Sequence, residues 1–157
     1  MSPVASPNKG TVEGDRGGYE YSAGRVLVVF EAGRSGAAAL RVGVDLAEAG
    51  RELSVVTLAP QAKPLRCCGG GGAGPYNCAV RAQADEELNE ARGLLGPTLK
   101  PAMLTVLVGH PDPPLVAWVG EHAFDIVVLP TRRLTRRGGR LARQLQRATS
   151  AEIRLVR

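Results

Sequence analysis

Asp125-Ile-Val-Val-Leu129 is a compact apolar run, which is typical of a strand buried on both faces of a parallel sheet. It is followed directly by Pro130-Thr-Arg-Arg-Leu-Thr-Arg-Arg-Gly-Gly-Arg140, then by a helical stretch and a short closing strand, residues 152–156. In an open α/β sheet, ligands bind in the crevice outside the carboxyl ends of the strands. The arginine-rich turn is therefore predicted to lie where such a fold would hold a phosphate.

Three further apolar stretches upstream predict the remaining strands of the same sheet. They are Arg25-Val-Leu-Val-Val-Phe30, Leu53-Ser-Val-Val-Thr-Leu58 and residues 101–108. Stretches with helical periodicity separate them, so strands and helices alternate along the chain. Such alternation predicts an α/β fold, namely an open five-stranded parallel sheet with helices on both faces.

The sequence suggests where two of the intervening helices begin. Ser35 is expected to cap a helix that stops at Gly50, because a serine side chain can accept a hydrogen bond from the first helical turn and a glycine can adopt a left-handed conformation. An irregular stretch, residues 60–76, follows the second strand. Asn77 is then expected to cap the next helix, which ends before Gly96.

Length and composition indicate one globular domain. The chain has 157 residues, of which 44% are hydrophobic but only 4% aromatic, so the core must consist of Val, Leu, Ile and Ala. Residues 1–24 are rich in Pro, Gly and Ser and are expected to form a flexible tail before a domain that spans 25–157. No stretch approaches the ~20 apolar residues of a membrane span, and the N-terminus lacks the apolar region of a signal peptide. A cytoplasmic protein with reduced cysteines is expected.

Positive charge is concentrated at the end of the chain. The net charge is +5, and nine arginines but a single acid, Glu152, lie between Thr131 and Arg157. Four of the arginines are spaced so that they share one helix face: Arg136, Arg140, Arg143 and Arg147. This face either binds an anionic partner or is simply solvated. Nucleic acid is not the expected partner, because no aromatic residues interleave these arginines to stack on bases.

The residues that could bind a metal or catalyse a reaction give weak patterns. Cys67 and Cys68 are adjacent, which is poor geometry for a zinc site, and Cys78 is the third cysteine. Three reduced thiols near a glycine-rich stretch are expected instead, with no metal. His110 is the one candidate acid–base residue, since it follows a strand, but the common nucleophile and metalloprotease motifs are absent from the sequence. We therefore expect a protein that is not an enzyme.

Several short segments, in this order, resemble the universal stress protein family, a branch of the nucleotide-binding α/β folds with adenine nucleotide alpha hydrolase-like architecture. The resemblance spans residues 25–157 and implies the strand order 3-2-1-4-5 and a homodimer that pairs through the last strand. The segments that carry it are Arg25-Val-Leu-Val-Val-Phe-Glu31, Ser35-Gly-Ala-Ala-Ala-Leu40, Val108-Gly-His-Pro111 and Phe124-Asp-Ile-Val-Val-Leu129.

The phosphate-binding motif of the family is largely missing. Members that bind ATP carry G-x-x-G-x9-G-[ST] after the fourth strand, where glycines let backbone N–H groups approach phosphates. Pro130 and Arg133 stand at the first two glycine positions, Gly139 matches the third, and Arg140 replaces the serine or threonine. Proline has no N–H donor. The resemblance therefore implies that the usual triphosphate cradle cannot form.

Other positions of the implied ligand site are retained in part. Glu31 stands where the family has an acidic residue at the ribose, Leu58 where a branched residue lines the adenine, and Gly109 at the end of the third strand; Thr131 lies in the turn. The expected function is a universal stress protein-like regulatory or binding protein that does not bind ATP in the usual way, with no cofactor or an adenine nucleotide. One alternative is an ATP or AMP binder that uses arginines at the phosphate site, and another is a basic scaffold for a protein or nucleic-acid partner. A small anionic ligand is the remaining candidate.

Overall fold

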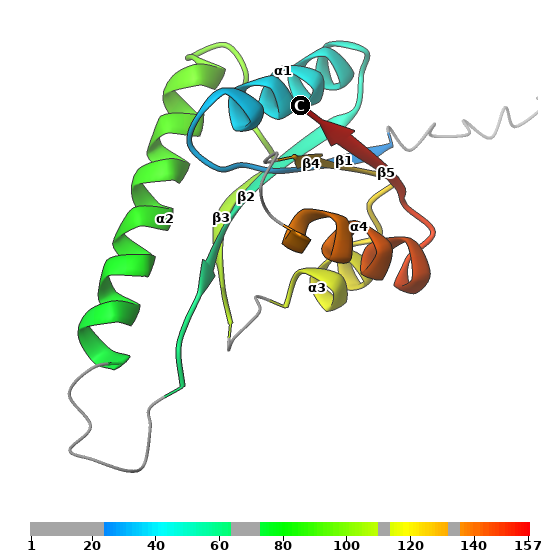
Figure 1. The fold of residues 1–157 in the computed structure, drawn as a ribbon. Coiled ribbons are helices and arrows are strands. Elements are labelled where there is room, and N and C mark those ends of the chain that lie inside the picture. The colour runs from blue at the N-terminus through cyan, green and yellow to red at the C-terminus, as the bar shows by residue number, and fades with distance from the viewer. Residues whose placement is uncertain (1–23, 64–72, 110–113, 132–135) are drawn as a thin grey trace, which may run out of the picture.

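The computed structural model describes residues 24–63, 73–109, 114–131 and 136–157 (Figure 1). Its centre is a five-stranded parallel sheet in the order β3-β2-β1-β4-β5. The predicted α/β class, the parallel sheet and the strand order are therefore confirmed. The expected tail, residues 1–24, lies outside the described residues except for Gly24.

The strands follow the apolar stretches of the sequence closely. The middle strand, β1, is buried on both faces, and Val26, Leu27 and Val28 have no exposed surface. This burial explains why the stretch is continuously apolar rather than alternating. The bounds of the strands are β1 Arg25–Val29, β2 Glu52–Pro60, β3 Met103–Gly109, β4 Ile126–Pro130 and β5 Glu152–Val156.

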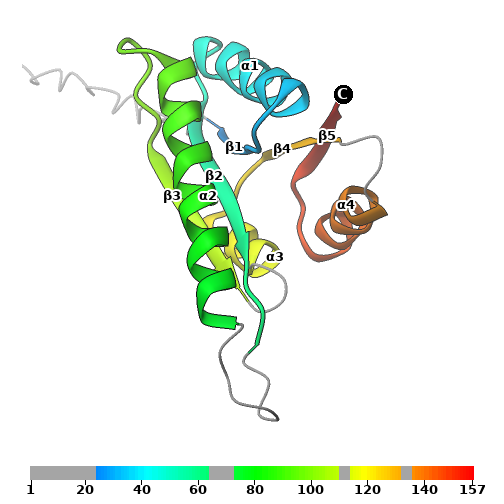
Figure 2. The same ribbon diagram turned by 60° about the vertical axis from the view of Figure 1, so that its left-hand side comes forward.

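The helices form a layer on each face of the sheet, as the two views in Figure 1 and Figure 2 show. The helices α1 and α2 cover one face, whereas the shorter helices α3 and α4 cover the other. Their bounds are α1 Arg34–Glu48, α2 Ala73–Leu95, α3 Leu115–His122 and α4 Arg136–Ala148.

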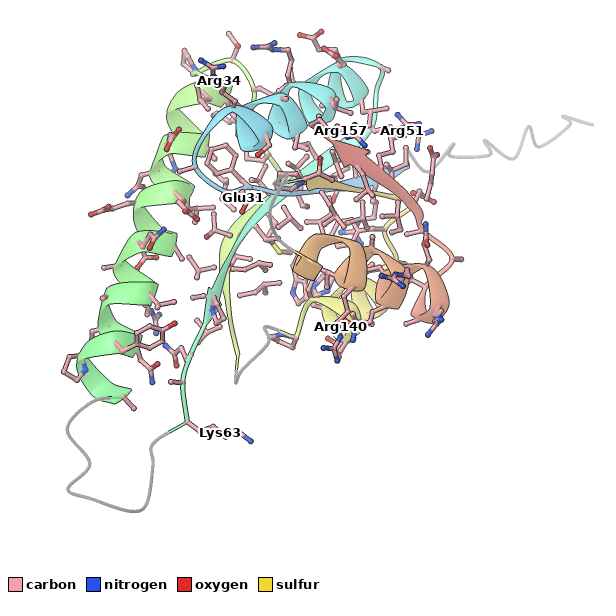
Figure 3. The ribbon with its side chains drawn as sticks, viewed as in Figure 1. Glu31, Arg34, Arg51, Lys63, Arg140 and Arg157 are labelled. Carbon is pink, nitrogen blue, oxygen red and sulfur yellow. The ribbon has the colours of Figure 1, made fainter. Side chains whose placement is uncertain are left out.

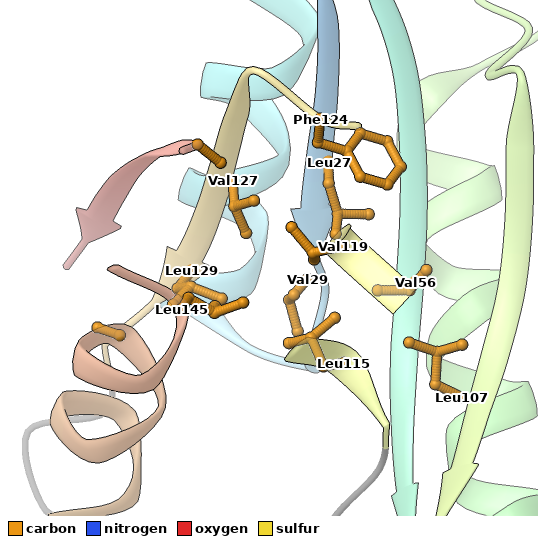
Figure 4. Close-up of a cluster of buried hydrophobic side chains, with 12 residues drawn as sticks. Leu27, Val29, Val56, Leu107, Leu115, Val119, Phe124, Val127, Leu129 and Leu145 are labelled. Carbon is orange, nitrogen blue, oxygen red and sulfur yellow. The ribbon is translucent and has the colours of Figure 1, made fainter. Parts of the chain in front are cut away.

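The alternating side chains of β1 divide the core into two clusters. Leu27 and Val29 point toward α3 and α4, where they pack with residues such as Leu145 (Figure 4). Val26 and Val28 point to the opposite face and pack beneath α1 and α2. Since successive residues of a strand face opposite sides, one buried strand supplies both clusters.

The turn from β1 into α1 depends on two glycines. Gly33 has a φ of 108° and directly precedes the helix, which begins at Arg34. The predicted Ser35 cap is wrong, because Ser35 already lies inside the helix and no side chain caps its start. Only glycine adopts this backbone conformation readily, so the helix begins where the glycine allows the chain to turn. Gly36, one turn later, faces the backbone of Glu31 with no room for a side chain.

The start of α2 also differs from the prediction. The helix begins at Ala73, so Asn77 is a residue of the helix and not its cap, and the irregular stretch is shorter than expected. The Asn77 side chain instead pairs with the backbone of Ala62, accepting from its N–H at 2.8 Å and donating to its carbonyl at 3.0 Å. This double hydrogen bond fastens the chain beyond β2 to the first turns of α2.

The amino ends of the strands are joined by Arg25. Its backbone N–H donates to Asp125 at 2.6 Å, its Nη1 donates to the carbonyl of His122 at 2.7 Å, and its guanidinium pairs with Glu52 at 3.1 Å. The same guanidinium lies 5.6 Å from the centre of the Phe124 ring, close enough for a cation–π interaction. One residue thus connects β1 to β2 and to the segment between α3 and β4.

Candidate functional site

Four of the predicted site residues lie along one edge of the sheet. Glu31 follows β1, Leu58 lies near the end of β2, Gly109 ends β3 and Thr131 follows β4. Since all strands are parallel and these four are neighbours in the order β3-β2-β1-β4, their carboxyl ends meet at this edge. This is the position at which open α/β sheets bind ligands.

The backbone of Glu31 is held by α1. Gly36 packs so closely on the Glu31 carbonyl group that a Cβ atom on Gly36 would overlap with it. The preceding residue, Phe30, donates its N–H to the Val56 carbonyl at 2.8 Å and is buried. The position of the acidic residue is therefore fixed from both sides, by β2 and by the first turn of α1.

The β2 and β3 side of the edge is built by backbone pairing. Pro60 is the register partner of Gly109, and the N–H of Gln61 donates to the Gly109 carbonyl at 2.7 Å. Leu58 is half-buried and packs against the core cluster on the α3 side. Gly109 therefore presents neither a side chain nor an unpaired carbonyl at this edge.

Thr131 directs its polar groups toward β5. Its backbone N–H donates to the Val156 carbonyl at 2.7 Å, and its hydroxyl donates to the same oxygen at 2.8 Å. Pro130, one residue earlier, has no N–H. Hence two consecutive residues at the end of β4 offer no free backbone donor to a phosphate.

The remaining predicted site residues belong to α4 or to the turn before it. Arg133 lies outside the described residues. Gly139 is exposed, and Arg140 is exposed on the outer side of α4, where Figure 3 shows it pointing away from Glu31. The structure therefore brings together Glu31 and the residues at the strand ends but not Arg140.

The cysteines form no metal site among the described residues. Cys78 is an exposed free thiol on α2, and Cys67 and Cys68 lie outside the described residues. Within the described part of the chain, no group of three or more His, Cys, Asp or Glu side chains could hold a metal ion. A recess of about 370 Å³ lies at the opposite, amino-terminal edge of the sheet, between Arg51 and Lys100.

None of the described helices is long and apolar enough to cross a membrane.

The arrangement of the strands and helices matches solved structures over most of the chain. A universal stress protein family structure from Burkholderia pseudomallei aligns with a TM-score of 0.61 at 15% identity, covering 86% of this chain and 96% of that one. A universal stress protein from Archaeoglobus fulgidus aligns with a TM-score of 0.57 at 19% identity, covering 85% and 98%. The chain has the universal stress protein fold. The resemblance stated from the sequence is thereby confirmed at the level of the fold.

Two solved structures with the universal stress protein fold were determined with nucleotides. One is a universal stress protein in complex with cAMP, which aligns with a TM-score of 0.55 at 18% identity over 87% of this chain and 98% of that one. The other is the Archaeoglobus fulgidus protein in complex with dAMP, with a TM-score of 0.55 at 19% identity over 87% and 99%. No protein-family model matches the chain, and no curated protein sequence matches it.

Sequence reasoning missed two residues that shape the candidate site. Gly36 sets the distance between α1 and Glu31, and Gln61 pairs with the end of β3. The first had a signal in the sequence, because Gly33 and Gly36 are spaced by three residues directly after a strand. The second had none, since its contact is made by the backbone.

Proposed function

We propose that this protein is a cytoplasmic regulatory or binding protein of the universal stress type, without enzymatic activity, that takes an adenine nucleotide or another small anion at the carboxyl edge of its sheet. The observation that carries the proposal is the alignment of Glu31, Leu58, Gly109 and Thr131 along this edge in the order of the strands. Solved structures with the same fold in complex with cAMP and dAMP support an adenine nucleotide as the ligand class.

The ligand we propose carries one phosphate rather than three. Pro130 supplies no N–H, and both donors of Thr131 are engaged by the Val156 carbonyl. A triphosphate needs several donors at this point to offset the loss of its hydration. A monophosphate needs fewer donors, so it fits a strand end with few free backbone N–H groups better than a triphosphate does.

AMP and cAMP are expected to bind at least as tightly as Mg-ATP, because the two additional phosphates of ATP gain no backbone donors. Changing Glu31→Gln should weaken AMP binding about ten-fold, since a hydrogen bond from a ribose hydroxyl to a charged carboxylate is worth on the order of 1.5 kcal/mol. Isothermal titration calorimetry with the three nucleotides measures both effects. Glu121→Gln is the matched control, because Glu121 is exposed on α3 and away from the strand ends.

Micromolar binding of Mg-ATP that exceeds AMP binding would contradict the monophosphate preference and would favour arginines acting in place of the glycine backbone. Equal AMP affinity in the wild type and in Glu31→Gln would remove Glu31 from the site. If none of the nucleotides binds, the proposed adenine nucleotide is wrong, and inorganic phosphate titrated in the same way tests the small anion that remains.

We further propose a homodimer that pairs through β5. This strand lies at the end of the sheet with β4 as its neighbour, and Leu155 on it is 50% exposed. Its charges are balanced within the strand, since Arg154 pairs with Glu152 at 2.8 Å. The hydrogen bond from Arg154 lowers the pKa of the Glu152 carboxyl. An exposed strand edge with an apolar side chain is suited to pairing with a second copy.

Changing Leu155→Lys should convert the dimer to a monomer, because a lysine on an edge strand opposes strand pairing. Sedimentation equilibrium of the wild type and the variant measures the mass directly. The control is Leu94→Lys, which alters a leucine of similar exposure, 55%, on α2. A wild type that sediments as a monomer, or a Leu155→Lys variant that remains a dimer, would rule out this interface.

A further inference from the structure

The outer face of α4 carries three exposed arginines. We call this surface the α4 arginine face, and it consists of Arg140, Arg143 and Arg147, all of which are exposed. They are three and four residues apart, so they lie above one another on one side of the helix. The sequence contains no acidic residue between Asp125 and Glu152. The arginines therefore repel one another, and a bound anion would relieve this repulsion.

The opposite side of α4 anchors the helix to the sheet. Ala142 and Leu145 are buried in the core cluster against the sheet, and Leu141 is half-buried beside them. The Nε of Arg143 donates to the Gly139 carbonyl at 3.1 Å, one turn earlier on the same helix. This bond uses one of the five N–H donors of a guanidinium. The other four remain to bind an anion.

The composition of this surface selects the kind of partner. The exposed described residues of α4 include no large apolar side chain: Gly139, Arg140, Arg143, Gln144, Gln146, Arg147 and Ala148. Apolar and aromatic side chains are enriched in the fully buried centres of surfaces that bind proteins. Binding to a phosphate chain depends instead on charge and on hydrogen bonds from arginine and glutamine.

The same residues indicate that recognition is directed to the phosphates and not to bases. The sequence of α4 contains no aromatic residue on which a base could stack. The absence of lysine after Lys100 means that every cation of this region is a guanidinium, which can donate two parallel hydrogen bonds to one phosphate. A phosphate chain without bases satisfies these donors as well as a nucleic acid does.

We propose that the α4 arginine face binds inorganic polyphosphate, a linear phosphate chain, through its phosphate groups. This surface is separate from the strand-end site, because Arg140 points away from Glu31 and the other two arginines lie further along α4. The inference therefore goes beyond the nucleotide function proposed above and does not depend on it.

The test compares two double variants with the same change in charge. Arg143→Gln with Arg147→Gln alters the α4 arginine face and leaves Arg140 in place. Arg41→Gln with Arg81→Gln removes two exposed arginines from α1 and α2, on the opposite side of the sheet. Fluorescence anisotropy at about 50 mM and about 200 mM salt measures binding to inorganic polyphosphate, to a short oligothymidylate and to polyglutamate. Thermal unfolding confirms that each variant is folded.

The α4 variant should bind polyphosphate about ten-fold or more weakly than the wild type, and its logarithmic salt dependence should fall by about two, one for each lost phosphate contact. The control variant should lose much less. Oligothymidylate should bind more weakly than polyphosphate, and AMP should not compete with polyphosphate. Tighter binding of oligothymidylate would identify nucleic acid as the ligand instead and would overturn the proposal.

Equal losses in the two variants would show that net charge alone attracts the chains, and the proposal would fail. Polyglutamate binding as tight as polyphosphate binding would also overturn it, in favour of an acidic protein segment. So would the absence of any binding at the lower salt concentration. Each of these results leaves the nucleotide titrations at the strand ends unaffected, so the two proposals can fail separately.

Discussion

Changing Gly36→Ala is expected to destabilise the protein by about 3 kcal/mol or more, at the upper end of what overpacking in a core costs. A Cβ atom at this position would overlap with the carbonyl oxygen of Glu31, which is backbone and cannot rotate away. The first turn of α1 must therefore move away from β1. Gly43, two turns later, packs on Val28 in the same close manner, so the displaced helix cannot recover its contacts by sliding.

Urea denaturation followed by circular dichroism measures the change in the free energy of unfolding. Gly93→Ala is the matched control, because Gly93 lies within α2 and a Cβ atom there would meet nothing within 4 Å. Alanine is favoured over glycine in a helix by about 1 kcal/mol, so this control should stabilise the protein. Two glycine-to-alanine changes are thus expected to act in opposite directions. A Gly36→Ala variant as stable as the wild type would show that α1 does not pack as described.

Changing Leu27→Ala should cost about 3–5 kcal/mol of stability. Leu27 has no exposed surface, lies in the central strand and packs in the cluster between the sheet and helices α3 and α4 (Figure 4). The variant loses the transfer free energy of the side chain and leaves a cavity, because a strand paired on both sides cannot collapse into it. For a domain with a typical stability of about 5–15 kcal/mol, this change removes a large share of the total.

Thermal and urea unfolding of Leu27→Ala should both shift to milder conditions. Leu94→Ala serves as the control, since Leu94 is 55% exposed on α2 and its truncation should change stability by less than about 0.5 kcal/mol. A cost below about 1 kcal/mol for Leu27→Ala would mean that the cluster is loosely packed.

Much of the fold could be predicted because the sequence patterns that indicate it extend over many residues. The run from Arg25 to Phe30 is apolar at nearly every position, as a strand covered on both faces requires, and the alternation with helices then leaves few possible topologies. The starts of the helices could not be predicted as well, because a cap is decided by one side chain. Ser35 and Asn77 both have suitable side chains, but a glycine with positive φ sets the first start, and Asn77 finds two hydrogen bonds on Ala62 instead.

The sequence predicted where the candidate site lies better than it predicted the hydrogen bonds of its residues. The carboxyl ends of parallel strands share one edge, so the placement of Glu31, Gly109 and Thr131 followed from the strand assignment. The direction of their polar groups did not, because the Thr131 hydroxyl turns to the Val156 carbonyl, 25 residues later in the chain. A helical repeat likewise indicates which arginines share a face but not which way this face points, and Arg140 turns outward.

The pairing of Asn77 with Ala62 has a consequence for how the chain tolerates changes in length. The two hydrogen bonds hold Ala62 and Asn77 together although 15 positions separate them in the sequence. Closing a longer loop costs little, about 0.6 kcal/mol of entropy for each doubling of its length. Insertions between residues 63 and 73 are therefore expected to leave the sheet unchanged, which makes this position suitable for an added peptide or a new binding element.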